Sequence, residues 1–131
     1  MSLPQRRRVV AAPTRKPPAE LRSVRVIFEA DPEPDTSYLE QDEFEDRLEA
    51  YKRGEFSFIG ARAEAEVIIE ETTQTLRSGG LYGIESDSED EYIDEIAAQE
   101  WAALRAVLKT VGVSTEQLPL AVNREWIEWR I

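Results

Sequence analysis

The side chains of this chain that could do chemistry are almost all carboxylates. Its 131 residues include 27 acidic and 16 basic side chains, but no histidine and no cysteine. This composition excludes a disulfide, a Cys or His zinc site, a histidine general base and a cysteine nucleophile. The most distinctive feature that remains is the set of carboxylates and the surface that they create.

One run of acids has the spacing of a calcium-binding loop. Positions 1, 3, 5 and 12 of such a loop would be taken by Asp31, Glu33, Asp35 and Asp42. The loop needs glycine at position 6, where this chain has Thr36, and two prolines interrupt the turn. Paired acids for glycoside hydrolysis occur by chance in so acidic a chain and carry no signal. We therefore expect no metal site, no cofactor and no enzymatic activity.

Two clusters of carboxylates are denser than folding requires. Acids of the first recur every three or four residues, so on a helix they would share one face and repel each other. In the second, residues 85–95, seven of eleven side chains are acidic and none is basic. A helix N-terminus favours three of these, at residues 89–91. The remaining candidates are Asp42, Glu45, Asp46 and Glu49 in the first cluster and Glu85, Asp87, Asp94 and Glu95 in the second.

Two interpretations of these clusters remain open: a solvated charged face and a binding surface for a basic partner. Residues 1–25 carry seven basic side chains and one acid, whereas the rest of the chain has a formal charge of −17. So acidic a domain repels nucleic acid and anionic membranes and attracts basic surfaces. We expect a basic protein partner, no direct nucleic-acid or membrane binding, and a cytoplasmic location, since neither a membrane helix nor a secretory leader is evident.

Periodicity predicts the elements that must position these acids. Residues 1–20 are basic and proline-rich, typical of a flexible tail, and residues 21–131 form a single acidic domain. Alternation and helical stripes predict strands and helices in the order βαββαβ. Their ranges are 23–30, 38–53, 55–70 with a bend near Gly60, 73–86 with a break at Gly79–Gly80, 89–111 and 120–131. This order predicts an α+β fold with two helices on one face of an antiparallel sheet, ferredoxin-like or a variant with a long central hairpin.

The predicted last strand presents a further candidate. Alternation places Trp126 on one face and Ile127, Trp129 and Ile131 on the other. If Trp129 lies in the core, Trp126 is exposed and available to a partner or to a homodimer.

The run from Tyr38 to Val113, which includes YLEQDEFEDRLEAYKRGEFSFIGARAEAEV and SGGLYGIESDSEDEYIDEI, resembles small acidic proteins of unknown function from phages and mobile elements. The resemblance implies an anti-defence role, like that of anti-restriction or anti-CRISPR proteins that imitate DNA, and it supplies no catalytic residues. The leading hypothesis is a non-enzymatic inhibitor, acting in the host cytoplasm if phage-encoded, whose acidic surface blocks a basic, nucleic-acid-binding groove. The alternative is an assembly module of a mobile element that dimerises through the last strand.

Overall fold

A computed structural model describes residues 19–131, so most of the predicted tail, residues 1–18, lies outside the described residues. The first strand begins earlier than predicted, at Ala19, which is buried. In chain order the strands and α-helices are β1 (Ala19–Ala30), α1 (Glu45–Lys52), β2 (Phe58–Ile69), β3 (Thr72–Arg77), β4 (Leu81–Glu85), α2 (Asp90–Thr110) and β5 (Ile127–Arg130). Short 3-10 turns occupy Ser37–Glu40, Asp42–Phe44, Thr115–Gln117 and Arg124–Trp126.

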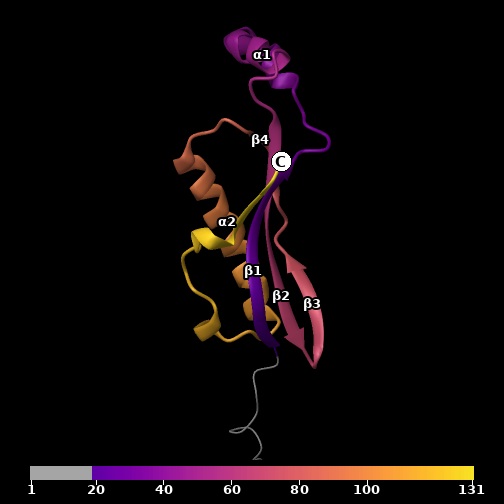
Figure 1. Ribbon diagram of the computed structural model, residues 1–131, viewed down its shortest axis with the longest axis vertical. Helices are drawn as coiled ribbons and strands as arrows, with labels where there is room; N and C mark the ends of the chain where they lie inside the picture. The colour runs from indigo at the N-terminus through magenta and orange to yellow at the C-terminus, as the bar shows by residue number, and fades with distance from the viewer. Residues whose placement is uncertain (1–18) are drawn as a thin grey trace, which may run out of the picture.

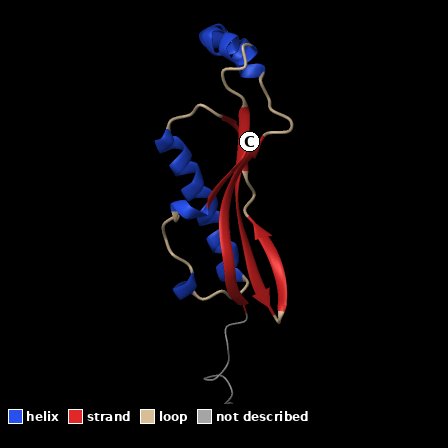
Figure 2. Ribbon diagram, in the orientation of Figure 1, coloured by secondary structure: helices blue, strands red, loops and turns tan. Residues whose placement is uncertain are grey.

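The strands form one mixed sheet in the order β3-β2-β1-β5, with β4 paired to β2 beyond the end of β3 (Figure 1). β2 is antiparallel to β1, β3 and β4, whereas β5 is parallel to β1. The predicted α+β class is confirmed, but the ferredoxin-like arrangement does not match. The sheet is not purely antiparallel, and α2 alone packs along it, while α1 lies beyond its end (Figure 2).

The long central hairpin follows the predicted pattern. β2 and β3 join through Glu70 and Glu71, whose positive φ angles of 49° and 69° form the tight turn. The register of β2 against β4 shifts between Ile59 and Ala61, where the bend was predicted. Gly60 is required at this point because a Cβ there would lie 2.0 Å from the ring of Tyr82.

The main core lies between the sheet and α2. The hydrophobic stripe predicted for α2 faces the sheet. It includes Ile96, Trp101, Leu104 and Leu108. The facing positions of β2 are the small residues at 61, 63 and 65, all alanine, and these leave room for the large side chains of the helix. Large and small side chains on facing elements interdigitate and fill the core without voids. Among the described helices, none has both the length and the apolar character to cross a membrane.

The predicted helix 38–53 is shorter than expected. Gln41 has an extended backbone (φ −75°, ψ 144°) between two 3-10 turns, so α1 begins only at Glu45. The interruption lets Leu39 turn inward, where it is fully buried with Ala50, Phe56 and Phe58. This end of the molecule therefore has a small hydrophobic cluster of its own, separate from the main core.

Candidate protein-binding surface

Two acidic segments that are distant in sequence meet at the α1 end of the molecule. From α1, the guanidinium group of Arg47 reaches Glu85 at 2.5 Å and Asp87 at 2.8 Å. The hydroxyl group of Tyr38 also donates a hydrogen bond to Glu85. The backbone adds to this link, since the amide of Ser86 donates to the carbonyl of Ser57 (2.8 Å). The first cluster and the start of the second are therefore held against each other.

The titration behaviour of these groups follows from their contacts. The hydrogen bond from Arg47 lowers the pKa of Asp87 below its usual range. Burial is the main cause that raises the pKa of Tyr38, and the hydrogen bond to Glu85 raises it further. Because Tyr38 stays protonated and Asp87 stays ionised, both links persist around neutral pH.

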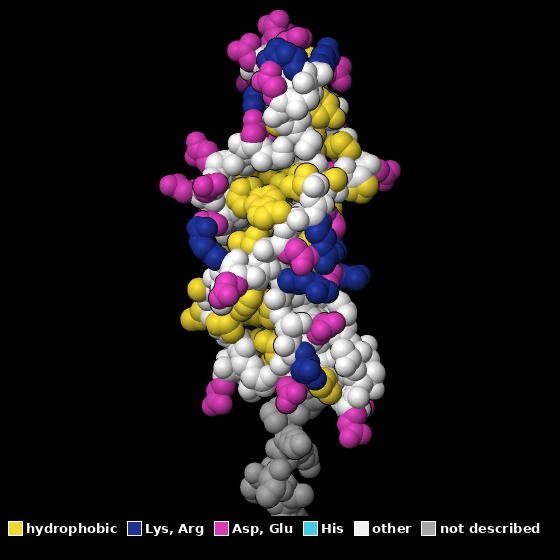
Figure 3. Space-filling view, viewed as in Figure 1, with side chains coloured by type: hydrophobic (Ala, Val, Ile, Leu, Met, Phe, Trp, Pro, Cys, Tyr) yellow, Lys and Arg dark blue, Asp and Glu magenta, His cyan; other side chains and the backbone are white. Residues whose placement is uncertain are grey.

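We define the acidic end as residues 31–55 and 85–95. The first range contains ten acidic and three basic side chains, and the second contains seven acidic and none, so each carries a formal charge of −7. All other described residues together hold ten acidic and eight basic side chains, a charge of −2. Figure 3 shows acidic side chains around the α1 end, with a few basic ones among them, and acidic and basic side chains intermixed further down the molecule.

The four candidates of the first cluster are all exposed. Glu45 and Asp46 lie in the first turn of α1, Glu49 in the next turn, and Asp42 in the preceding 3-10 turn. Within residues 19–131, none of the four forms an ion pair. Their mutual repulsion is smaller than the helical spacing predicts, since Asp42 is outside the helix and first-turn acids are favoured by the helix dipole. The four carboxylates thus remain available to a partner at little cost to folding.

The second cluster is partly neutralised. Glu85 and Asp87 are paired with Arg47, and Asp94 is paired with Arg124 at 2.7 Å. Glu95 is exposed and forms no ion pair with any described residue. Of the eight predicted carboxylates, the five that remain both exposed and unpaired are Asp42, Glu45, Asp46, Glu49 and Glu95.

The two C-terminal tryptophans exchange their predicted roles. Residues 120–126 do not form a strand. The side-chain oxygen of Asn123 accepts a hydrogen bond from the backbone amide of Glu125 (2.9 Å), and a 3-10 turn begins there. Trp126 is therefore half-buried, with its ring 5.0 Å from that of Trp101. Trp129 stacks on Phe28 at 4.5 Å and is 52% exposed. The prediction that Trp126 is the exposed tryptophan is wrong, and Trp129 is the accessible one.

Sequence reasoning missed a charge cluster on the sheet face opposite α2. Glu64 is 4% exposed and accepts hydrogen bonds from Arg25 (2.8 Å), Arg62 (3.1 Å) and Arg77 (3.0 Å). Burial alone would raise the pKa of Glu64, but the three arginines outweigh it and hold the pKa at about 2. The strand alternation of residues 62, 64 and 66 was the available signal, but only the strand pairing identifies the partners.

Two of the four acids with calcium-loop spacing, Asp31 and Asp35, have local structural roles. Asp31 accepts hydrogen bonds from the backbone amides of Glu33 and Gly83, each at 3.0 Å, and Asp35 accepts them from the backbone amide (3.0 Å) and the hydroxyl (2.7 Å) of Ser37. Over residues 19–131, no three carboxylates converge in the manner of a metal site. These side chains stabilise the turns that lead from β1 to α1.

What this surface offers a partner is a projecting end with unpaired negative charge, held in place by Arg47 and Tyr38. Comparison of the chain with protein-family models, with curated proteins and with solved structures finds no match.

Proposed function

We propose that this protein is a non-enzymatic binding protein whose acidic end enters a positively charged groove on a partner that otherwise binds nucleic acid. The observation that carries the proposal is the convergence of two segments of −7 each through Arg47 and Tyr38. The remaining described residues carry only −2, so the negative potential is directional. Such a field steers a basic partner to one end of the molecule and gives fast, salt-sensitive association.

The shape of the acidic end supports the same proposal. α1 lies beyond the end of the sheet, as Figure 1 shows. Its carboxylates can therefore enter a groove on a partner while the sheet remains outside. Nucleic acid itself is repelled by this charge, which leaves a basic protein surface as the fitting ligand. The function class that combines these properties is an anti-defence inhibitor that imitates DNA, working in the cytoplasm.

A charge-matched pair of variants tests the proposal. The test variant, D42K/E45K/D46K/E49K/E95K, reverses the five predicted carboxylates of the acidic end that are exposed and unpaired. The control, E20K/E70K/E71K/E116K/E125K, reverses five exposed acids elsewhere and therefore has the same net charge. Both are immobilised and exposed to lysate of the source organism at low salt, and short duplex DNA is then added as a competitor.

The parent and the control variant should retain a protein that duplex DNA displaces, whereas the test variant should retain none. Equal capture by both variants would show that the acidic end is not the binding surface. Capture that duplex DNA leaves unchanged would refute a nucleic-acid-binding groove as the target.

A further inference from the structure

β5 is an edge strand with exposed hydrophobic side chains. Among the described strands it pairs only with β1, so its other edge is free. Trp129 is 52% exposed, and Ile131, which immediately follows the strand, is 65% exposed. Figure 3 shows hydrophobic side chains gathered over β5. A free edge bordered by apolar side chains is a ready template for pairing with another strand.

The direction of the backbone groups in β1 determines which groups of β5 are free. The amide of Asp31 donates to the carbonyl of Phe58 at 3.0 Å, within the antiparallel register of β1 and β2. Backbone groups of alternate residues point to opposite sides of a strand. The N–H and C=O of Phe28, three residues before Asp31, therefore point away from β2 and towards β5.

In a parallel ladder, a residue bonds to the two neighbours of the residue opposite it. Phe28 lies opposite Trp129, so Glu128 and Arg130 turn their backbone groups towards β1. The N–H and C=O groups of Trp129 and the C=O of Ile127 consequently point to the free edge, whereas the N–H of Ile127 donates to the carbonyl of Arg124 and closes the preceding 3-10 turn. The two groups of Trp129 and the carbonyl of Ile127 are therefore directed towards the position that a second strand would occupy.

The sequence of this strand is complementary to itself. Residues 127–131 read Ile-Glu-Trp-Arg-Ile, with Trp129 at the centre, isoleucines two residues away and opposite charges one residue away. We propose that a second copy of this chain pairs with β5 in the antiparallel direction, about a two-fold axis at Trp129. Each Glu128 then lies opposite Arg130 of the other copy, and the two Trp129 side chains are adjacent. On the same face, each Ile127 lies opposite Ile131 of the other copy.

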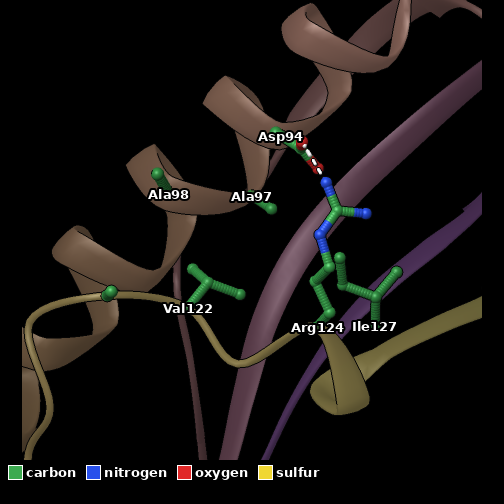
Figure 4. A pocket seen from close by; sticks show the side chains of 7 residues that line it. Asp94, Ala97, Ala98, Val122, Arg124 and Ile127 are labelled. Atoms are coloured by element: carbon green, nitrogen blue, oxygen red, sulfur yellow. Dashed lines mark hydrogen bonds and ion pairs between the residues drawn. The ribbon is translucent and has the colours of Figure 1, made fainter.

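A cavity beside β5 fits this pairing. It lies between α2 and the segment before β5, has a volume of about 270 Å³, and is bordered by the Asp94–Arg124 ion pair. Figure 4 shows Ala97, Ala98, Val122 and Ile127 around it. Because Ile131 of the second copy lies opposite Ile127, its side chain is placed at the mouth of this cavity. The small side chains of the wall leave room for it.

This dimer does not depend on the proposed function, but it would determine how the acidic ends are presented to a partner. Antiparallel pairing of the two β5 strands directs the two acidic ends in opposite directions, which makes the assembly bivalent. The exposed residue at the interface is Trp129, not Trp126.

Charge-swap variants of the full chain test the proposal by sedimentation equilibrium. In the proposed dimer, position 128 of each copy faces position 130 of the other. R130E therefore places two acids opposite each other at both of these contacts, and E128R places two arginines opposite each other. Each should weaken dimerisation by roughly tenfold or more, and E128R/R130E should restore the dimer. I131D should also yield monomers, whereas E116R, in the distant Thr115–Gln117 turn, should not.

Circular dichroism of each variant confirms that the domain remains folded. The dimer should persist at about 1 M salt, where exposed ion pairs are screened, while partner capture by the acidic end should be lost. The proposal is overturned by a monomeric parent, by a dimer that the single variants leave intact, or by a double variant that remains monomeric.

Discussion

The acidic end and the sheet face around Glu64 are built from the same residue types, but their charges are arranged differently. On the sheet face, Arg25 and Arg77 lie directly opposite Glu64 on the neighbouring strands, so the register places cations beside the carboxylate. On α1, the helical spacing brings Glu45 and Asp46 next to Glu49, so like charges become neighbours. The sheet face is thus a closed, stabilising network, while the acidic end keeps its charge for a partner.

Arg47 is where the two regions can be compared most directly. It pairs with Glu85 and Asp87 as the three arginines pair with Glu64, but it forms no ion pair with the five exposed candidate acids. Carboxylates that stabilise the fold and carboxylates that are free to bind can therefore be separated by substitution.

The largest expected effect is that of E64Q. The substitution removes the common anion of three arginines from a nearly buried position, and it should lower the free energy of unfolding by about 3 kcal/mol. Urea denaturation measures the loss. E66Q, on the same strand and the same face, should cost less than about 0.5 kcal/mol. Equal losses would show that the network around Glu64 does not stabilise the fold.

Acid should remove the same contribution. The pKa of Glu64 is about 2, below its ordinary value of 4.5, so its stabilisation is complete above pH 4.5 and is lost as the pH falls towards 2. The pKa difference corresponds to a contribution on the order of 3 kcal/mol. The stability gap between the parent and E64Q, measured by urea denaturation, should therefore close between these pH values. A gap independent of pH would contradict the assignment.

A smaller effect is expected for R47Q, which separates the two segments of the acidic end. The variant loses two partly exposed ion pairs and the contact of the guanidinium with the Phe56 ring, 3.9 Å from its centroid. We expect a loss of about 1–2 kcal/mol in thermal or urea unfolding. R53Q is the control, since within residues 19–131 Arg53 forms an ion pair only with Glu55 and both are more than half exposed. If R53Q costs as much, Arg47 has no special role.

The smallest effect is a gain. E49K replaces two repulsive contacts on α1, with Glu45 and Asp46, by attractive ones, and replaces one attraction, to Arg53, by a repulsion. The net effect should be to raise the free energy of unfolding by about 0.5 kcal/mol. The gain should vanish at about 1 M salt, and E116K should show none. A loss of stability in E49K would mean that Glu49 has a folding role that its exposure does not suggest.

Local patterns in the sequence predicted much of the fold. The stripe through Ile96, Trp101 and Leu104 predicted α2 almost to the residue, and alternation predicted β2 and the break at Gly79–Gly80. The predicted helix 38–53 was correct only over Glu45–Lys52 and the predicted strand 120–131 only over Ile127–Arg130, because burial of Leu39 and the turn begun by Asn123 override the local preference. Four of the eight candidate carboxylates were chosen from their helical spacing and four from local charge density, and neither pattern identifies their ion-pair partners.

The sequence by itself determined that this chain is strongly acidic and has no histidine or cysteine chemistry. It also determined that charged side chains alternate with alanines along β2. Only the tertiary structure decided which carboxylates are neutralised, since Arg47 reaches Glu85 and Asp87 from another segment and Arg25 reaches Glu64 from another strand. It also decided that Trp129, and not Trp126, is exposed. The physical reason is that periodicity is a property of neighbouring residues, whereas neutralisation and burial depend on contacts that form only when distant segments pack together.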